Sequence, residues 1–190
     1  MADALHLETA RLRLRPATPA DRADLVALEA DPEVMRFLNG GRPVPEAGDP
    51  TGSFLTPRGG EAGVWTATLR DDGTFVGWFS LRSCGDGAAE LGYRLRRVLW
   101  GQGYATEGAQ ALVAAGLGHL GYERVRAETM AVNLASRRVL ERAGLRHVST
   151  LVVDWPNPLP GSERGEVIYE VERPQPSRNL SPSIPGLRPR

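Results

Sequence analysis

The chain has 190 residues, of which 41% are hydrophobic and 24% are charged, and its 23 basic and 23 acidic side chains give a formal net charge of zero. This composition is typical of a folded globular domain and excludes an intrinsically disordered chain. The charge balance provides no basic excess for holding a nucleic-acid backbone, and no apolar run approaches the roughly 18 residues of a membrane span. We therefore expect no nucleic-acid partner and no membrane partner.

The reactive residue types exclude several kinds of chemistry. Every basic residue is Arg, so no lysine is present to form a Schiff base with a substrate. The single cysteine, Cys84, allows neither an intramolecular disulfide nor a multi-cysteine metal site, which fits a reducing compartment. The histidines His6, His119 and His147 lack the spacing of metal ligands. We expect a cytoplasmic protein that holds no metal.

The first third of the chain predicts one strand, two helices and a long loop. Residues 7–15 predict a half-buried strand, because Leu12 and Leu14 alternate there with three arginines, at positions 11, 13 and 15. Thr18 followed by Pro19 predicts the start of a helix that ends near residues 31–32, and residues 32–38 predict a short second helix. The stretch that follows is rich in Gly and Pro and predicts a loop up to about residue 63, of a kind that often forms a lid.

Strands and helices alternate in the rest of the chain. Periodicity and turn residues predict strands at 64–70, 75–82, 88–95, 124–130, 146–154 and 166–172, and helices at 106–120 and 134–143. An Asp-Gly pair at 72–73 predicts the hairpin between the first two of these strands. From residue 174 onward the chain has five prolines and no acidic residue, so we expect a disordered tail after a single domain over 1–173.

The stretch LWGQGYATEG, residues 99–108, lies between a predicted strand and a predicted helix. Glycines just before a helix let an anion approach the unpaired N–H groups at its positive end. On its own, the pair Gly101 and Gly103 fits an ordinary tight turn equally well. No third glycine completes G-x-G-x-x-G and no G-K-[ST] follows, so the stretch matches neither a dinucleotide fingerprint nor a nucleoside-triphosphate loop. A different phosphate-binding loop is indicated.

Two segments together resemble a known family. The strand ELGYRL and the turn WGQGYATE are followed downstream by N-x-x-S-x-x-V-L-x-x-x-G-L, which begins at Asn133. This pair of segments resembles the GNAT superfamily of acetyltransferases, in particular the branch that includes ribosomal-protein N-terminal acetyltransferases. The resemblance covers roughly residues 7–173. It implies a mixed α/β fold: a twisted, largely antiparallel sheet of six or seven strands, with flanking helices and a splayed central strand pair.

The resemblance also implies how acetyl-coenzyme A binds. Backbone amides of the turn hold the pyrophosphate, and backbone groups of the preceding strand bind the pantetheine arm in the gap between the splayed strands. The cofactor contacts carried over are Tyr93, Leu95, Gly101, Gln102, Gly103, Tyr104, Ala105, Thr106, Asn133 and Ser136. Trp100 departs from the pattern, because Gln or Arg commonly stands at that position.

The implied reaction is acetyl transfer to a primary amine by direct attack in a ternary complex. The amine must be neutral to attack, and the departing sulfur must be stabilised. Many relatives place a Tyr acid seven residues after the Asn, but Leu140 stands here, so the resemblance implies Ser136 as the partner of the thiolate. Glu90 and Asp154 are the candidate bases. Glu90 also fits a solvated strand carboxylate, and Asn133 with Ser136 fits a helix N-cap.

Two alternatives to this function stay open. The missing Tyr leaves room for a non-catalytic sensor or scaffold that binds an acyl-coenzyme A, which slow thiol release with every amine would favour. A wide pocket beside Tyr93 would instead indicate transfer of a longer acyl group. The amine itself could belong to a small molecule or to a protein N-terminus, because one scaffold serves many acceptors. Many relatives form dimers, so a homodimer is a further open alternative.

Overall fold

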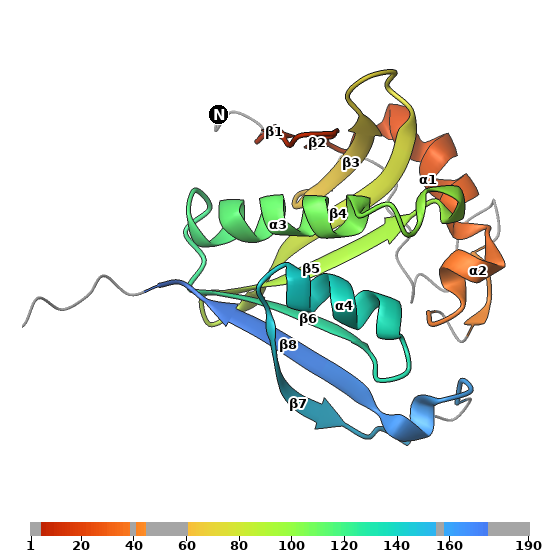
Figure 1. Cartoon of the computed structure of the whole chain (residues 1–190), viewed down its shortest axis with the longest axis vertical. Helices are drawn as coiled ribbons and strands as arrows, with labels where there is room; N and C mark the ends of the chain where they lie inside the picture. The colour runs from red at the N-terminus through yellow and green to blue at the C-terminus, as the bar shows by residue number, and fades with distance from the viewer. Residues whose placement is uncertain (1–4, 39–40, 45–60, 155–157, 175–190) are drawn as a thin grey trace, which may run out of the picture.

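The computed structural model describes residues 5–38, 41–44, 61–154 and 158–174 (Figure 1). Most of the predicted loop over 39–63, and the predicted tail from residue 175, lie outside the described residues. The described strands form one eight-stranded sheet in the order β1-β2-β3-β4-β5-β6-β8-β7. Every neighbouring pair is antiparallel except β5 and β6. This confirms a mixed α/β fold with a largely antiparallel sheet.

The strands are β1 (Leu7–Glu8), β2 (Leu12–Pro16), β3 (Val64–Leu69), β4 (Phe75–Gly85), β5 (Ala88–Leu95), β6 (Arg124–Met130), β7 (Arg146–Leu151) and β8 (Glu166–Glu172). The α-helices are α1 (Arg22–Glu29), α2 (Pro32–Met35), α3 (Tyr104–Leu117) and α4 (Leu134–Arg142), and the short 3-10 helices are η1 (Pro19–Asp21), η3 (Arg97–Leu99) and η4 (Ser162–Arg164).

The strand predicted over residues 7–15 is in fact two strands joined by a tight turn. The N–H of Thr9 donates to the carbonyl of Leu12 at 2.9 Å, and the Thr9 hydroxyl accepts from the N–H of Leu12 at 2.9 Å. The chain therefore reverses, and Leu7 pairs with Leu14. The Leu–Arg alternation covers only residues 11–15 and therefore reports β2 alone, so it did not reveal the turn that precedes it. This split gives eight strands instead of the six or seven expected.

Several other boundaries differ from the prediction. Helix α2 ends at Met35 instead of residue 38, and strand β4 extends to Gly85 instead of residue 82, because its pairing with β5 continues through a bulge. Helix α3 begins at Tyr104, two residues earlier than expected, because Gly103 with φ of 87° already acts as its N-cap. Strand β7 ends at Leu151 instead of residue 154. The reason is pairing: Leu151 lies opposite Glu166, the first residue of β8, so the following residues have no strand beside them.

Helices cover both faces of the sheet (Figure 1). Successive residues of β4 point to opposite faces, so Phe79 joins the core under α3 and α4, whereas Trp78 packs against Leu25 and Leu28 of α1. Helix α3 lies very close to the sheet at Gly108, where an added Cβ would come within 2.2 Å of the Phe79 ring. The position of α3 above the sheet therefore depends on a missing side chain.

Strands β5 and β6 are the splayed pair. They pair in parallel over only three positions, Ala88–Glu90 with Arg124–Arg126. Beyond that point β5 continues along β4 to Leu95, while β6 continues along β8 to Met130. The two central strands therefore separate after Glu90.

A partly buried ion pair fixes the N-terminal end of η1 and α1. The carboxylate of Asp21 accepts hydrogen bonds from the guanidinium of Arg15 at 2.6 and 2.8 Å and from the N–H of Thr18 at 2.7 Å. These contacts lower the pKa of Asp21 to about 2, mainly through Arg15. Thr18 is the N-cap of η1, so the predicted helix start is confirmed.

Candidate active site

The turn before α3 exposes backbone donors. Gly101 and Gly103 have φ of 76° and 87°, in the left-handed region that side-chain-bearing residues avoid. The first N–H groups of a helix have no intrahelical acceptor, and they lie at the positive end of its dipole. A Cβ at Gly101 would meet nothing within 4 Å, so the turn borders open space. The arrangement suits a bound anion such as a phosphate.

Trp100 ties this turn to the end of β5. Its indole N–H donates to the carbonyl of Leu95 at 2.8 Å, and the residue remains 47% exposed. The residue that departs from the family pattern therefore has a structural role here. It also means that one of the two backbone groups predicted at Leu95, the carbonyl, already has a partner within the protein.

The backbone N–H and C=O groups of β5 point alternately toward β4 and into the gap between β5 and β6, called the splay below. The N–H of Arg96 bonds the carbonyl of Val76 at 2.9 Å, and the register continues with Leu95 opposite Gly77 and Tyr93 opposite Phe79. Hydrogen-bonded pairs alternate in an antiparallel ladder. The backbone groups of Tyr93 and Leu95 therefore point away from β4, into the space between β5 and β6.

A pair of hydroxyl groups bridges β5 and α4 across this space. The Tyr93 hydroxyl lies 2.9 Å from the Ser136 hydroxyl. Burial raises the pKa of Tyr93 to about 12, and the hydrogen bond to Ser136 only partly opposes this, so the phenol stays protonated at neutral pH. The N–H of Ser136 donates to the side-chain oxygen of Asn133 at 3.2 Å, which makes Asn133 the N-cap of α4. The structure thus brings Tyr93, Asn133 and Ser136 together.

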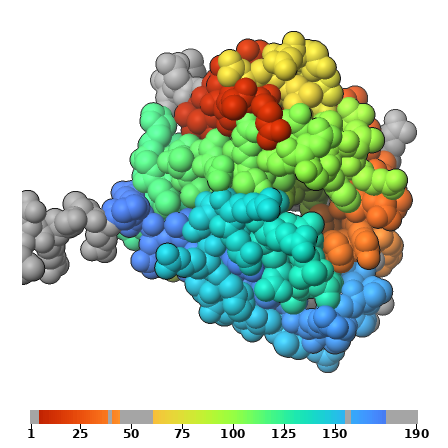
Figure 2. All heavy atoms as spheres, in the orientation of Figure 1, coloured from red at the N-terminus to blue at the C-terminus, as the bar shows by residue number. Residues whose placement is uncertain are grey.

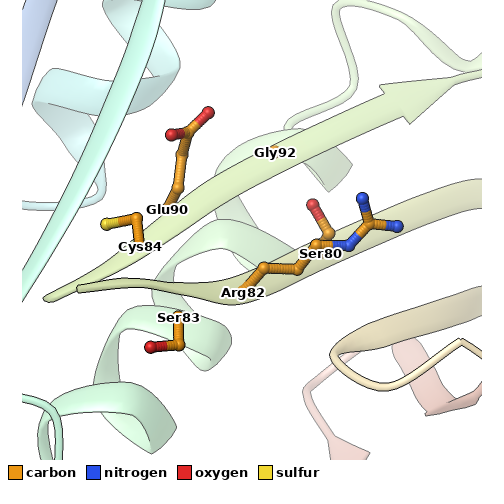
Figure 3. A pocket seen from close by; sticks show the side chains of 6 residues that line it. All are labelled: Ser80, Arg82, Ser83, Cys84, Glu90 and Gly92. Atoms are coloured by element: carbon orange, nitrogen blue, oxygen red, sulfur yellow. The ribbon is translucent and has the colours of Figure 1, made fainter. Parts of the chain in front are cut away.

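Glu90 lies on the other face of β5, at the last residue pair before the strands separate. Its side chain is 51% exposed, and its nearest ion partner is Arg126 at 3.9 Å. Glu90 also lines a pocket of about 220 Å³ together with Arg82, Ser80 and Gly92 (Figure 3). The candidate base and the two hydroxyl groups therefore occupy opposite faces of the same strand.

The structure does not bring Asp154 into this group. The residue was expected to close a strand over 146–154, but it lies three residues beyond the end of β7 and is exposed. Within the described part of the chain, Asp154 makes no hydrogen bond or ion pair. The predicted strand end is wrong, and a catalytic role for Asp154 stays a prediction.

A cluster that sequence reasoning missed joins the β1–β2 turn to the first turn of α3. The carboxylate of Glu107 accepts from the Thr9 hydroxyl at 2.5 Å, from the Arg11 N–H at 2.8 Å and from Arg11 Nε at 2.7 Å. Figure 2 shows the N-terminal segment, in red, lying against α3, in green. Burial would raise the pKa of Glu107, but the bonds from Thr9 and Arg11 outweigh it and hold the pKa below its ordinary value.

Arg11 also contacts the glycine turn itself. Its Nη1 donates to the carbonyl of Gln102 at 2.9 Å, and its guanidinium lies 4.4 Å from the centre of the Tyr104 ring. A Cβ on Gly103 would lie 3.3 Å from Arg11 Nη2. One sequence signal could have suggested this cluster: an acid at Glu107, beside a predicted anion site, requires a cation to offset it.

No described helix is long and apolar enough to cross a bilayer.

Comparison with known proteins identifies similar sequences and folds. The family model "Acetyltransferase (GNAT) domain" matches residues 11–146. The "FsC-acetyl coenzyme A-N(2)-transacetylase" of Aspergillus fumigatus is 36% identical over 193 aligned positions, which cover 96% of this chain and 82% of that protein. The uncharacterized protein YkkB of Bacillus subtilis is 30% identical, over 83% of this chain and 94% of that protein.

Solved structures share the fold at lower identity. A GNAT-family acetyltransferase from Bacillus anthracis superposes with a TM-score of 0.75 at 23% identity, covering 89% of this chain and 99% of that chain. RimL, described as a ribosomal L7/L12 α-N-protein acetyltransferase in complex with coenzyme A, superposes with a TM-score of 0.68 at 18% identity, covering 88% and 98%.

Proposed function

This chain belongs to the GNAT family of acetyltransferases, and from that premise we propose that it transfers an acetyl group from acetyl-coenzyme A to a primary amine. The Aspergillus relative is named for acetyl-coenzyme A and for transfer to a nitrogen, and the RimL structure is described as a complex with coenzyme A. The observation that carries the proposal is the hydroxyl pair of Tyr93 and Ser136 facing the splay, next to the exposed N-terminus of α3.

The glycine turn would bind the cofactor through its backbone. The pyrophosphate accepts hydrogen bonds from the free N–H groups between Gly101 and Thr106, with Arg11 adding positive charge beside Gly103. The pantetheine arm then runs between β5 and β6. It forms hydrogen bonds with the free backbone groups of Tyr93 and with the N–H of Leu95, in the way that an additional strand would. This path leads from the glycine turn toward the vertex of the splay, which is the point near Glu90 where β5 and β6 separate.

The thioester at that vertex would have an acid on one face and a base on the other. On the Glu90 face, the carboxylate or a water that it holds removes a proton from the ammonium group, and the neutral amine attacks the thioester carbonyl. The C–N bond forms and the C–S bond breaks as Ser136 donates its proton to the sulfur, with Tyr93 donating to Ser136 in turn and then taking up a proton from solvent. The amide nitrogen releases its second proton to solvent. Proximity in the ternary complex supplies most of the acceleration, because no covalent enzyme intermediate forms.

Calorimetry and a free-thiol assay test this proposal. Acetyl-coenzyme A should bind the wild-type chain, and thiol should be released when primary amines are supplied. A Gly103→Glu variant that keeps its circular dichroism spectrum should not bind, because a carboxylate would then project into the phosphate site. Absence of binding to the wild type, or unaltered binding to the folded variant, would contradict the proposal.

A further inference from the structure

The pocket on the face of β5 that carries Glu90 contains two opposite charges, those of Arg82 and Glu90, which do not form an ion pair with each other. Arg82 on β4 lies directly opposite Glu90 on β5. Side chains at such positions start about 5 Å apart, and opposite charges there ordinarily interact. Within the described part of the chain Arg82 nevertheless makes no ion pair or hydrogen bond, and Glu90 approaches only Arg126, at 3.9 Å. A separated cation and anion therefore share one pocket.

The floor of the pocket is small and polar. Figure 3 shows Glu90 projecting from β5 and Arg82 extending along β4 past Ser80. A Cβ at Gly92 would lie 2.8 Å from the Ser80 hydroxyl, so the glycine keeps this floor open beside the two charges. The pocket volume of about 220 Å³ is below the roughly 300 Å³ at which drug-sized ligand sites begin. It suits a small polar group.

The neighbouring charges leave the Arg82 end positive. Arg94 lies on the same face, but its guanidinium pairs with the fully buried carboxylate of Glu29, which also accepts from the Trp78 indole at 3.1 Å. Burial lowers the pKa of Arg94, and the charge of Arg82 lowers it further. The positive charge of Arg94 is thus offset locally, whereas no acidic side chain among the described residues pairs with Arg82.

We propose that this pocket recognises an amine acceptor whose neighbouring carbon carries a carboxylate, as in a free α-amino acid, with the carboxylate on Arg82 and the amine at Glu90. The inference rests on the proposed function, because it takes the pocket as the acceptor side of the splay. The planar fork of Arg matches a carboxylate with two parallel hydrogen bonds. Directly opposed residues of β4 and β5 have Cα atoms about 5.5 Å apart, so both side chains can reach substituents of one carbon atom.

A binding experiment tests the carboxylate directly, without requiring turnover. L-alanine, L-serine, L-phenylalanine and L-glutamate, and the α-amide of each, are titrated by ligand-observed NMR into the full chain saturated with coenzyme A. Affinities are compared after correction for the protonation state of each amine. At least one acid should bind about tenfold or more tightly than its amide, since a charge-assisted bond replaces a neutral one. In Arg82→Gln that ratio should fall below about twofold, with the amide affinity unchanged.

Arg13→Gln is the matched control and should keep the ratio, because Arg13 is an exposed arginine whose one ion-pair partner among the described residues is Glu8. The inference is overturned if no acid binds, if acids and amides bind equally, or if the preference survives in Arg82→Gln. Failure of the proposed function is distinguishable, since it appears as loss of acetyl-coenzyme A binding in calorimetry. A chain that binds acetyl-coenzyme A and acetylates amides without preferring acids contradicts only the carboxylate site.

Discussion

Replacing Arg11 with Ala should weaken the binding of acetyl-coenzyme A without slowing the chemical step. Arg11 Nη2 lies 3.3 Å from the Cβ position of Gly103, so a phosphate bonded to the first N–H groups of α3 would lie about 6 Å from this guanidinium. At an effective dielectric of about 40–80, suited to a side chain that is 46% exposed, one unit charge at that distance contributes about 0.7–1.4 kcal/mol. A pyrophosphate with about two charges then loses about 1.4–2.8 kcal/mol, which corresponds to a KM about 10- to 100-fold higher.

The assay is steady-state thiol release with acetyl-coenzyme A varied, at low and at high salt. The KM should rise and kcat should change less than about twofold, and the effect should shrink at about 0.5 M salt because the charge is screened. Glu107→Gln introduced into Arg11→Ala should recover part of the lost affinity, since it removes the negative charge that Arg11 offsets. Arg13→Ala is the control and should leave KM unchanged, because in the part of the chain that the structure describes the Arg13 guanidinium pairs with Glu8 and not with the glycine turn. An unchanged KM in folded Arg11→Ala, or weaker binding on adding Glu107→Gln, would refute this reasoning.

Three other predictions concern catalysis, pH and packing. Ser136→Ala should lower kcat about 10- to 100-fold and leave the KM for acetyl-coenzyme A within about twofold of its wild-type value. Adding Tyr93→Phe should lower kcat little further, since the two hydroxyl groups act on the same proton transfer. If the two substitutions instead lowered kcat independently, the hydroxyl groups would have separate roles. Asp21→Asn should destabilise by about 1–2 kcal/mol in urea unfolding at pH 7, because the folded pKa of Asp21 is depressed from 3.8 to about 2. That difference should vanish as the pH falls from about 4 to about 2, and a constant difference would exclude the ion pair as its source. Gly108→Ala should cost about 1–3 kcal/mol through overpacking, and Phe79→Leu should cost less in that background than in the wild type.

The sequence predicted those parts of the molecule that depend on local chemistry. Rules that span a few positions account for three such features: the glycines with positive φ before a helix, Asn133 as an N-cap, and the Leu–Arg alternation of residues 11–15. The splayed pair came from the family resemblance instead, because no local pattern reports where two strands separate.

Long-range contacts between polar side chains could not be predicted in the same way. Arg11 and Glu107 are 96 positions apart, and each fits a solvated surface residue when read alone. The buried pair of Glu29 and Arg94 spans 65 positions and has no periodic signal. The error at residues 152–154 has a related cause: the apolar, β-branched residues continue through Val152 and Val153, but the partner strand begins only at Glu166.

The short β5–β6 ladder has a consequence for the stability of the whole domain. Strands β1–β5 and β6–β8 form two part-sheets, and among the described strands three parallel residue pairs are the only ladder that joins them. A cofactor arm bonded to both edges of the gap would complete that junction, so the cofactor would serve as a structural component as well as an acyl donor. At a ligand concentration of about 100 times Kd, binding adds about 2.7 kcal/mol to the free energy of unfolding. The thermal midpoint should therefore follow the coenzyme A concentration, and slower hydrogen exchange at the amides of Tyr93 and Leu95 should accompany it.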